Sequence, residues 1–332
     1  MRNAVKEMTG LSLRPVPSIQ DYALIGDTHG IALVSRSGTI DWCGFPHVNS
    51  PPFLLRLLDA AQGGFFHLAP AGGAVVSRRY QADSNVLETT FETRSGRLLL
   101  RDAMEVGPHG VHHLGDRPAR RHRILRTLTC VQGHADVEIV LRVTPDYARK
   151  KATAVRGADA GTFQFEWEGG DVSLSASVPL EALGDTAWAR VALTEGQMLA
   201  AVLGDLLELN WEARDIDRRL DRVNRYWQAW AARSRYQGPY RAAVVRSALA
   251  LKLLTHEPSG AIVAAPTTSL PEVLHGSRNW DYRFCWLRDA TFTLHALELL
   301  GHFDEAHDFM HWIERVWRRG SELQIMYGVN GE

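Results

Sequence analysis

The chain has 332 residues, which predicts about two domains at a typical size of ~150 residues each. Hydrophobic residues make up 45% and charged residues 23%, and 37 lysines and arginines nearly balance 38 aspartates and glutamates, as in an ordinary globular protein. The net charge of −1 gives no overall attraction to nucleic acid or to an anionic membrane, so neither is an expected partner.

The sequence favours a cytoplasmic protein. Residues 1–15 lack the apolar run of a signal peptide, and no later segment approaches the ~18 uninterrupted apolar residues of a membrane helix. Cys43, Cys130 and Cys285 are odd in number and far apart, which indicates neither a disulfide framework nor a zinc cluster. The cysteines therefore predict no metal site.

Up to about Leu203 the sequence predicts strands. Residues 30–45 and residues 86–102 each contain two short β-rich runs around a Ser-Gly pair, which is typical of a hairpin. In residues 163–174 apolar side chains alternate with polar ones on either side of a Gly-Gly pair, as in half-buried antiparallel strands. Several hairpins in succession predict a β-sandwich as the N-terminal domain, with limits 1–204.

The hydrophobic period changes to that of a helix near Asp205. The opposite face of this predicted linker helix, within residues 205–236, carries Asp215 with Arg219 and Asp221 with Arg225, spaced to form i,i+4 ion pairs. One apolar face is expected to be buried by the residues Ile216, Leu220, Val223, Trp227 and Trp230.

The C-terminal part, residues 237–332, is predicted to be helical. Helices are expected from Tyr240 to Leu254, from Asp289 as N-cap to Leu300, and from Asp304 to Arg319. A strand-like run from Leu323 to Tyr327 follows, with no evident partner.

The most unusual segment is RNWDYRFCWLRD, residues 278–289. A buried aromatic turn in which Asp289 only caps a helix would explain any one of these residues. Their combination favours a sugar site, because a sugar stacks its apolar face on aromatic rings and presents hydroxyls to guanidinium and carboxylate groups.

Other clusters are assigned structural roles. His307 and His311 resemble a zinc-peptidase helix, but Asp replaces Glu and no later histidine could be a third ligand, so we interpret them as helix-surface residues. Residues 109–122 contain histidines without ligand spacing, interpreted as solvated: His109, His112, His113 and His122. Five arginines are interpreted as a charged hairpin loop that leads into a strand at Ile124: Arg117, Arg120, Arg121, Arg123 and Arg126.

Three long motifs in order resemble glycoside hydrolase family 15, the glucoamylase-like and trehalase-like enzymes. They are DYALIGDTHGIALVSRSGTIDWCGFP from Asp21, LRVTPDY from Leu141, and the segment from Arg246 to Asp289 that contains SGAIVAAPTTSLPE and NWDYRFCWLRDA. The resemblance implies a β-sandwich, a helical linker and an (α/α)6 barrel, which agrees with the change of period. It departs at residues 48–50, Val-Asn-Ser, where relatives tend to have Phe-Asp-Ser.

The resemblance also implies an activity, the inverting hydrolysis of an α-glucosidic bond at a non-reducing glucose unit, without a cofactor. Arg288 and Asp289 match the pair that binds the hydroxyls of the terminal glucose. Trp286 matches an aromatic residue of the same pocket, and Tyr282 matches the tyrosine near the developing oxocarbenium ion. The implied partner is a small α-glucoside or oligosaccharide.

Neither catalytic carboxylate of that family maps onto the chain; both are expected beyond Glu332. Twelve barrel helices need roughly 190 residues with their loops, so residues 237–332 predict an incomplete barrel and an N-terminal fragment. The alternative is a non-catalytic carbohydrate-binding or scaffold protein derived from the family. The choice between trehalose and malto-oligosaccharides, and the oligomeric state, stay open.

Overall fold

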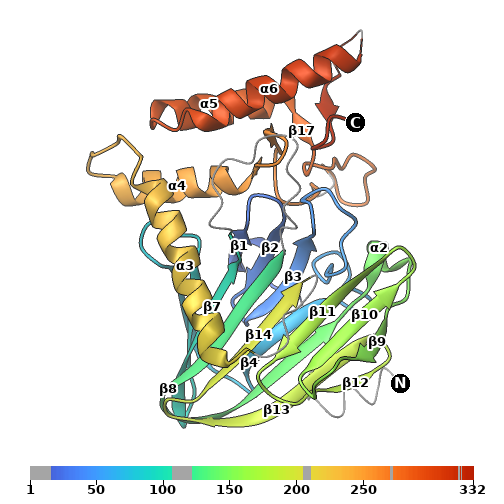
Figure 1. Cartoon of the computed structure of the whole chain (residues 1–332), viewed down its shortest axis with the longest axis vertical. Coiled ribbons are helices and arrows are strands. Elements are labelled where there is room, and N and C mark those ends of the chain that lie inside the picture. Colours follow the sequence, from blue (N-terminus) through green and yellow to red (C-terminus); the bar gives the residue numbers. More distant parts are fainter. Residues whose placement is uncertain (1–15, 107–121, 205–210, 270–271, 321, 323) are drawn as a thin grey trace.

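The computed structural model describes residues 16–106, 122–204, 211–269, 272–320, 322 and 324–332. An antiparallel sheet forms the N-terminal part and helices form most of the C-terminal part (Figure 1). The sheet strands are β1 (Tyr22–Gly26), β2 (Ile31–Ser35), β3 (Thr39–Gly44), β4 (Phe65–Pro70), β5 (Val75–Tyr80), β6 (Leu87–Glu92), β7 (Gly96–Met104), β8 (Arg123–Arg142), β9 (Thr153–Arg156), β10 (Thr162–Trp167), β11 (Gly170–Ala176), β12 (Glu181–Leu183), β13 (Thr186–Thr194) and β14 (Met198–Gly204). The three hairpins predicted from turn signals and alternation are confirmed, as β2–β3, β6–β7 and β10–β11.

The long strand β8 holds the sheet together. Its first half pairs with β7 and β14, and its second half pairs with β4 and β13. Between the halves lies Gly133, with a φ of 70°, a value that glycine adopts without a steric cost. Inward-facing side chains of both halves form one core, which includes Ile40, Phe66 and Phe165. The strands predicted as a sandwich of two packed sheets form, among the described residues, one continuous antiparallel sheet of fourteen strands.

Helix α3 (Ala213–Ala231) lies against β7, β8 and β14. Its predicted apolar face is confirmed, because Ile216, Leu220, Val223, Trp227 and Trp230 are all buried. The predicted ion pairs along the helix are wrong. Instead Arg219 contacts Glu105 at 3.2 Å, and Asp221 accepts a hydrogen bond from Arg101 at 2.6 Å. Arg101 lies on β7 and Glu105 directly follows it, so these two contacts fasten the helix to this part of the sheet.

The arginine-rich segment gives a second correction. Strand β8 already begins at Arg123, and Arg126 is fully buried there, with its Nε 2.8 Å from Oδ1 of Asp102. The Arg126 guanidinium also donates to the carbonyl oxygens of Phe66 and Gly38. The predicted loop positions Arg117, Arg120 and Arg121 lie outside the described residues, as do His109, His112 and His113.

The C-terminal part contains α4 (Arg241–Leu253), α5 (Leu287–Leu299) and α6 (Asp304–Arg319), where α5 packs against both others. Between and after them lie four short strands, β15 (Thr255–His256), β16 (Ala261–Ile262), β17 (Cys285–Trp286) and β18 (Met326–Tyr327). The limits of α4 and α6 agree with the prediction, but α5 begins two residues before Asp289, which therefore lies in its first turn. The run that ends at Tyr327 does have a partner, because β18 pairs with β17. Among the described residues no helix is long and apolar enough to cross a membrane.

Candidate functional site

The aromatic loop of residues 278–289 runs beside the segment that follows β16. Ala264 and Ala265 donate backbone hydrogen bonds to the carbonyl oxygens of Phe284 and Tyr282, at 3.1 and 2.8 Å. Farther along, the Ser269 amide donates to the carbonyl oxygen of Trp280 at 2.8 Å. The two strand-like segments support each other, so the loop has a defined backbone despite its position outside the main sheet.

Arg283 anchors this loop to the N-terminal part. Its guanidinium is buried, pairs with the carboxylate of Asp281 at 2.7 Å, and donates to the Ser50 carbonyl oxygen at 2.9 Å and to the Tyr147 hydroxyl. It also lies 5.4 Å from the ring centroid of Trp42. Burial would lower the pKa of Arg283, but the Asp281 carboxylate outweighs burial and raises it. The arginine is therefore a permanent charge that positions the loop, a role that spacing alone does not reveal.

Tyr282 and Trp286, the two predicted aromatic site residues, are brought together. Their ring centroids lie 5.7 Å apart at an interplanar angle of 66°, an edge-to-face contact. The indole N–H of Trp286 donates to the carbonyl oxygen of Asp281 at 3.3 Å, which fixes the ring, and both side chains are half-buried. Such a pair offers an exposed apolar surface of the kind on which a sugar ring stacks.

Arg288 and Asp289 form a second pair, at the N-terminus of α5. Nη2 of Arg288 lies 3.0 Å from Oδ2 of Asp289, and the arginine side chain is 68% exposed. The first turn of a helix favours a carboxylate, because the unpaired amide groups there carry partial positive charge. An exposed guanidinium beside a partly buried carboxylate can donate to and accept from neighbouring hydroxyl groups.

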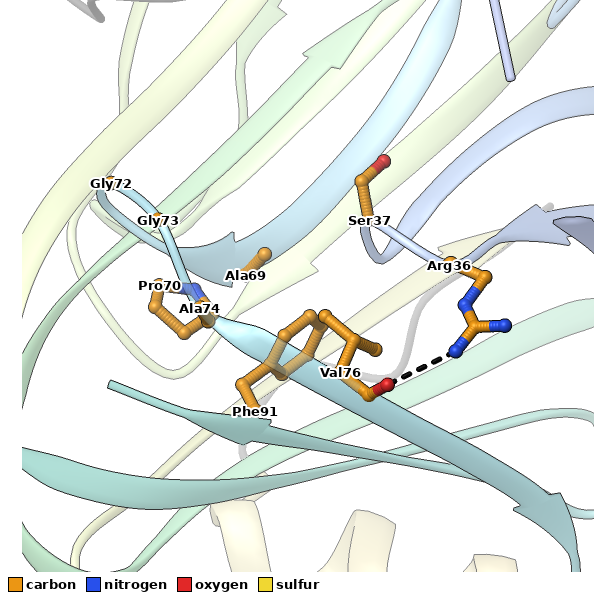
Figure 2. Close-up of a pocket in the computed structure, with 9 residues that line it drawn as sticks. All are labelled: Arg36, Ser37, Ala69, Pro70, Gly72, Gly73, Ala74, Val76 and Phe91. Atoms are coloured by element: carbon orange, nitrogen blue, oxygen red, sulfur yellow. Dashed lines mark hydrogen bonds between the residues drawn. The ribbon is translucent and has the colours of Figure 1, made fainter. Parts of the chain in front are cut away.

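A surface hollow of ≈ 430 Å³ lies elsewhere, between the β2–β3 turn and the β4–β5 loop (Figure 2). Among the described residues that line it, Arg36 alone is charged, and its guanidinium donates to the carbonyl oxygen of Val76 at 3.1 Å. The described lining residues include no carboxylate, histidine or thiol, so they offer no group for acid–base chemistry.

Several histidines that are distant in the sequence lie close together in the structure. His122, predicted to be solvated, is buried, and its Nδ1 lies 3.1 Å from Oδ2 of Asp27. Nearby, His29, His47 and His256 are the only group of three potential metal ligands close to one another among the described residues. His307 and His311, in contrast, meet on the exposed face of α6 with ring nitrogens 3.2 Å apart, in line with the helix-surface interpretation. No short-range sequence pattern could have indicated the cluster of His29, His47 and His256, because its members lie far apart in the chain.

Two family models match almost the whole chain. The trehalase-like N-terminal model covers residues 9–227, and the model for glycosyl hydrolases family 15 covers residues 238–332. The chain belongs to glycosyl hydrolase family 15. The resemblance read from the three sequence motifs is thereby confirmed.

Several proteins that are similar in sequence to this family 15 chain are trehalases. The trehalase of Mycolicibacterium smegmatis is 37% identical over 97% of the chain, and that of Mycobacterium tuberculosis is 35% identical over 96%. These alignments cover 52% and 50% of the two relatives, so the chain spans about half the length of the curated relatives it matches. A crystal structure of a bacterial glucoamylase complexed with acarbose has a TM-score of 0.65 at 11% identity, covering 93% of this chain and 52% of the other. That likeness supports the fold.

Proposed function

We propose that this family 15 chain is the N-terminal portion of an inverting α-glucosidic hydrolase, trehalase-like or glucoamylase-like, that releases glucose from a non-reducing end. The observation that carries the proposal is the pairing of Tyr282 with Trp286 and of Arg288 with Asp289 within eight consecutive residues. The trehalase relatives and the acarbose-bound glucoamylase support a glucoside as substrate.

The proposed roles follow from the chemistry of these four side chains. Tyr282 and Trp286 would pack against the apolar face of the terminal glucose, and Arg288 and Asp289 would bind its hydroxyls. Inversion needs a carboxylic acid on one side of the bond and a carboxylate that activates water on the other, ~6.5–9.5 Å apart. We assign neither of these groups to a described residue.

We further propose that α4, α5 and α6 belong to an (α/α)6 barrel. Several large apolar side chains on α5 and α6 are exposed, and additional barrel helices would cover such a surface. These side chains are Phe292, Leu299, Met310 and Trp317. The proposed domain limits remain 1–204, 205–236 and 237–332.

Glucose release from trehalose and maltose tests the proposal, with the 332-residue chain compared with the whole reading frame of its gene. We expect turnover only from a polypeptide that contains both carboxylates. In that polypeptide Arg288→Ala and Asp289→Ala should each lower kcat/KM by about 10-fold or more, because a hydrogen bond to a charged group contributes about 1.5–3 kcal/mol.

Arg278→Ala is the matched control, because Arg278 is an exposed arginine of the same loop with only a 3.5 Å ion pair to Glu272. Unchanged kinetics in the Arg288 and Asp289 variants would contradict the assignment of the sugar site. Robust turnover by the 332-residue chain would contradict the placement of the carboxylates outside it. A monodisperse, cooperatively melting polypeptide that binds glucosides without turnover would favour the non-catalytic alternative.

A further inference from the structure

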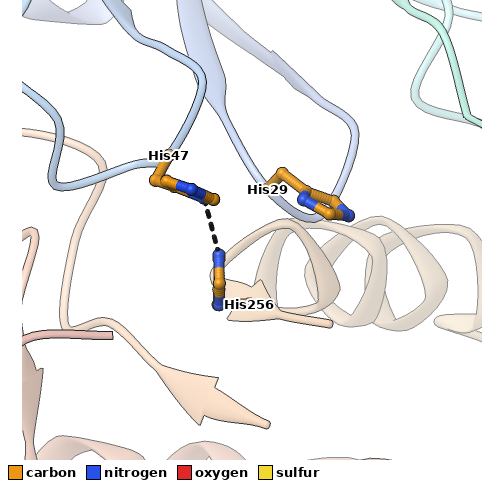
Figure 3. Close-up of side chains that lie close together, drawn as sticks. All are labelled: His29, His47 and His256. Atoms are coloured by element: carbon orange, nitrogen blue, oxygen red, sulfur yellow. Dashed lines mark hydrogen bonds between the residues drawn. The ribbon is translucent and has the colours of Figure 1, made fainter. Parts of the chain in front are cut away.

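Three segments that are distant in sequence bring His29, His47 and His256 together (Figure 3). His29 lies in the turn between β1 and β2, His47 follows β3, and His256 ends β15 in the helical part. One nitrogen from each ring can be chosen so that all three lie within 4.8 Å of one another. His47 and His256, separated by 209 positions, approach to 3.1 Å between Nδ1 and Nε2.

We propose that His29, His47 and His256 form a binding site for a divalent transition-metal ion, for which zinc is the probe. Two nitrogens bound to one tetrahedral zinc lie about 3.3 Å apart, since each Zn–N bond is about 2.0–2.1 Å long. The His47 and His256 nitrogens, at 3.1 Å, are close to this separation, and zinc binding would require the third nitrogen, which lies within 4.8 Å of both, to move closer. Imidazole ligands suit zinc, copper, nickel and cobalt, whereas magnesium and calcium prefer oxygen.

The electrostatic surroundings favour a cation. The Asp27 carboxylate accepts the backbone N–H of Gly30 at 2.8 Å, and its Oδ2 lies 3.1 Å from Nδ1 of His122. An acidic side chain therefore lies beside the imidazoles, where it would attract a cation.

Neighbouring groups help to position His256 and His29. Nδ1 of His256 lies 2.8 Å from the Ser259 hydroxyl, which leaves Nε2 directed at His47. The Asp27 carboxylate accepts the backbone N–H of His29 at 3.0 Å and so shapes the turn that carries this ring. Hydrogen bonds of this kind to the second nitrogen or to the backbone of a ligating histidine orient it toward the metal.

The location indicates what the metal would do. Thr28, next to His29, donates its hydroxyl to the Glu257 carboxylate at 2.7 Å, so the site lies where the β1–β2 turn contacts the β15–β16 turn. An ion bound there would join the sheet to the helical part and stabilise their contact. His47 is half-buried, whereas the other two rings are buried, which gives the ion a route from solvent.

Zinc alone, added to untagged 332-residue chain, tests the proposal by calorimetry and by elemental analysis after gel filtration. We expect about one tightly bound zinc per chain and a higher melting temperature with zinc. His47→Gln and His256→Gln should each weaken binding by about 100-fold or more, since even outer-shell changes cost 10- to 100-fold. Imidazole nitrogen splittings in the electron paramagnetic resonance spectrum of the copper-loaded wild type provide a readout that needs no variant.

The matched control is His307→Ala/His311→Ala, which removes the other close histidine pair, on the exposed face of α6. This variant should retain the tight zinc and its effect on melting. The proposal is overturned if the wild-type chain binds no zinc, if this control abolishes binding, or if folded His47→Gln binds zinc as the wild type does. Because His47 is the most exposed of the three, its variant is the one expected to fold, as circular dichroism would verify.

Discussion

Arg283, in the loop before α5, donates a hydrogen bond to the hydroxyl of Tyr147, 136 positions earlier in the chain. Tyr147 belongs to the LRVTPDY segment, and Arg283 belongs to the aromatic loop, so two of the family motifs meet at this contact. The N-terminal part thus supports the loop that carries the proposed sugar-binding residues.

Replacing this anchor should destabilise the protein. Arg283→Ala leaves Asp281, the Tyr147 hydroxyl and the Ser50 carbonyl oxygen without their donor, so we expect the free energy of unfolding to fall by on the order of 2–4 kcal/mol. Tyr147→Phe removes one hydrogen bond and should cost about 1 kcal/mol. Urea denaturation measures both, and a loss below about 0.5 kcal/mol for Arg283→Ala would contradict the anchoring role.

The buried pair of Arg126 with Asp102 gives a prediction with an internal control. Arg126→Met leaves the Asp102 carboxylate buried without its cation, which should cost about 3–5 kcal/mol. Burial raises the pKa of Asp102 even against the opposing effect of Arg126, which shows that the ionised carboxylate is costly to bury. Once Arg126 is replaced, removing this carboxylate as well should restore part of the lost stability. The double variant with Asp102→Leu should therefore be more stable than the single variant. The urea midpoints of the single and double variants test this prediction. If the stability losses of Arg126→Met and Asp102→Leu simply add in the double variant, the two residues are not coupled as predicted.

Glu305 predicts a pH dependence. Burial would raise its pKa, but the ion pair with Lys252 at 2.9 Å and the Trp230 hydrogen bond outweigh burial and lower the pKa to about 2. A lowered folded-state pKa contributes stability that is present above the unfolded value of 4.5 and is lost as pH falls toward 2. The contribution is about 3 kcal/mol, since one pKa unit corresponds to about 1.4 kcal/mol.

Urea denaturation between pH 5 and 2 measures this contribution. Glu305→Gln should unfold at lower urea at neutral pH, because Lys252 loses its partner, but its stability should depend less steeply on acid pH. Asp304→Asn, at an exposed neighbouring carboxylate paired with Arg233, is the control and should retain the wild-type slope. Equal slopes for wild type and Glu305→Gln would refute the assignment.

Trp42 couples the sheet to the segment beside the aromatic loop. Its ring is fully buried, and its indole N–H donates to the Pro266 carbonyl oxygen at 2.9 Å. Trp42→Phe keeps an aromatic ring but removes the donor and leaves space, so a loss of about 1–3 kcal/mol is expected. The exposed Trp317→Phe should change stability by less than about 0.5 kcal/mol in the same assay.

Local elements of this fold follow from the sequence. Alternation at period two predicts the β10–β11 hairpin, and the spacing of Ile216, Leu220 and Val223 predicts the buried face of α3, both as observed. The aromatic loop is also evident from composition, and the structure pairs Tyr282 with Trp286 as that composition favours. The roles of Tyr282, Trp286, Arg288 and Asp289 in binding a sugar remain predictions.

The sequence by itself determined the family, the strand-rich first part and the helices of the second, because periodicity and turn chemistry depend on residues close together in the chain. The tertiary structure decided which charges pair: Arg126 with Asp102 in the core, and Arg219 with Glu105 instead of Asp215. It also assembled His29, His47 and His256. Such contacts join residues that only folding brings together, and the distance and burial that determine their energy have no counterpart in spacing along the chain.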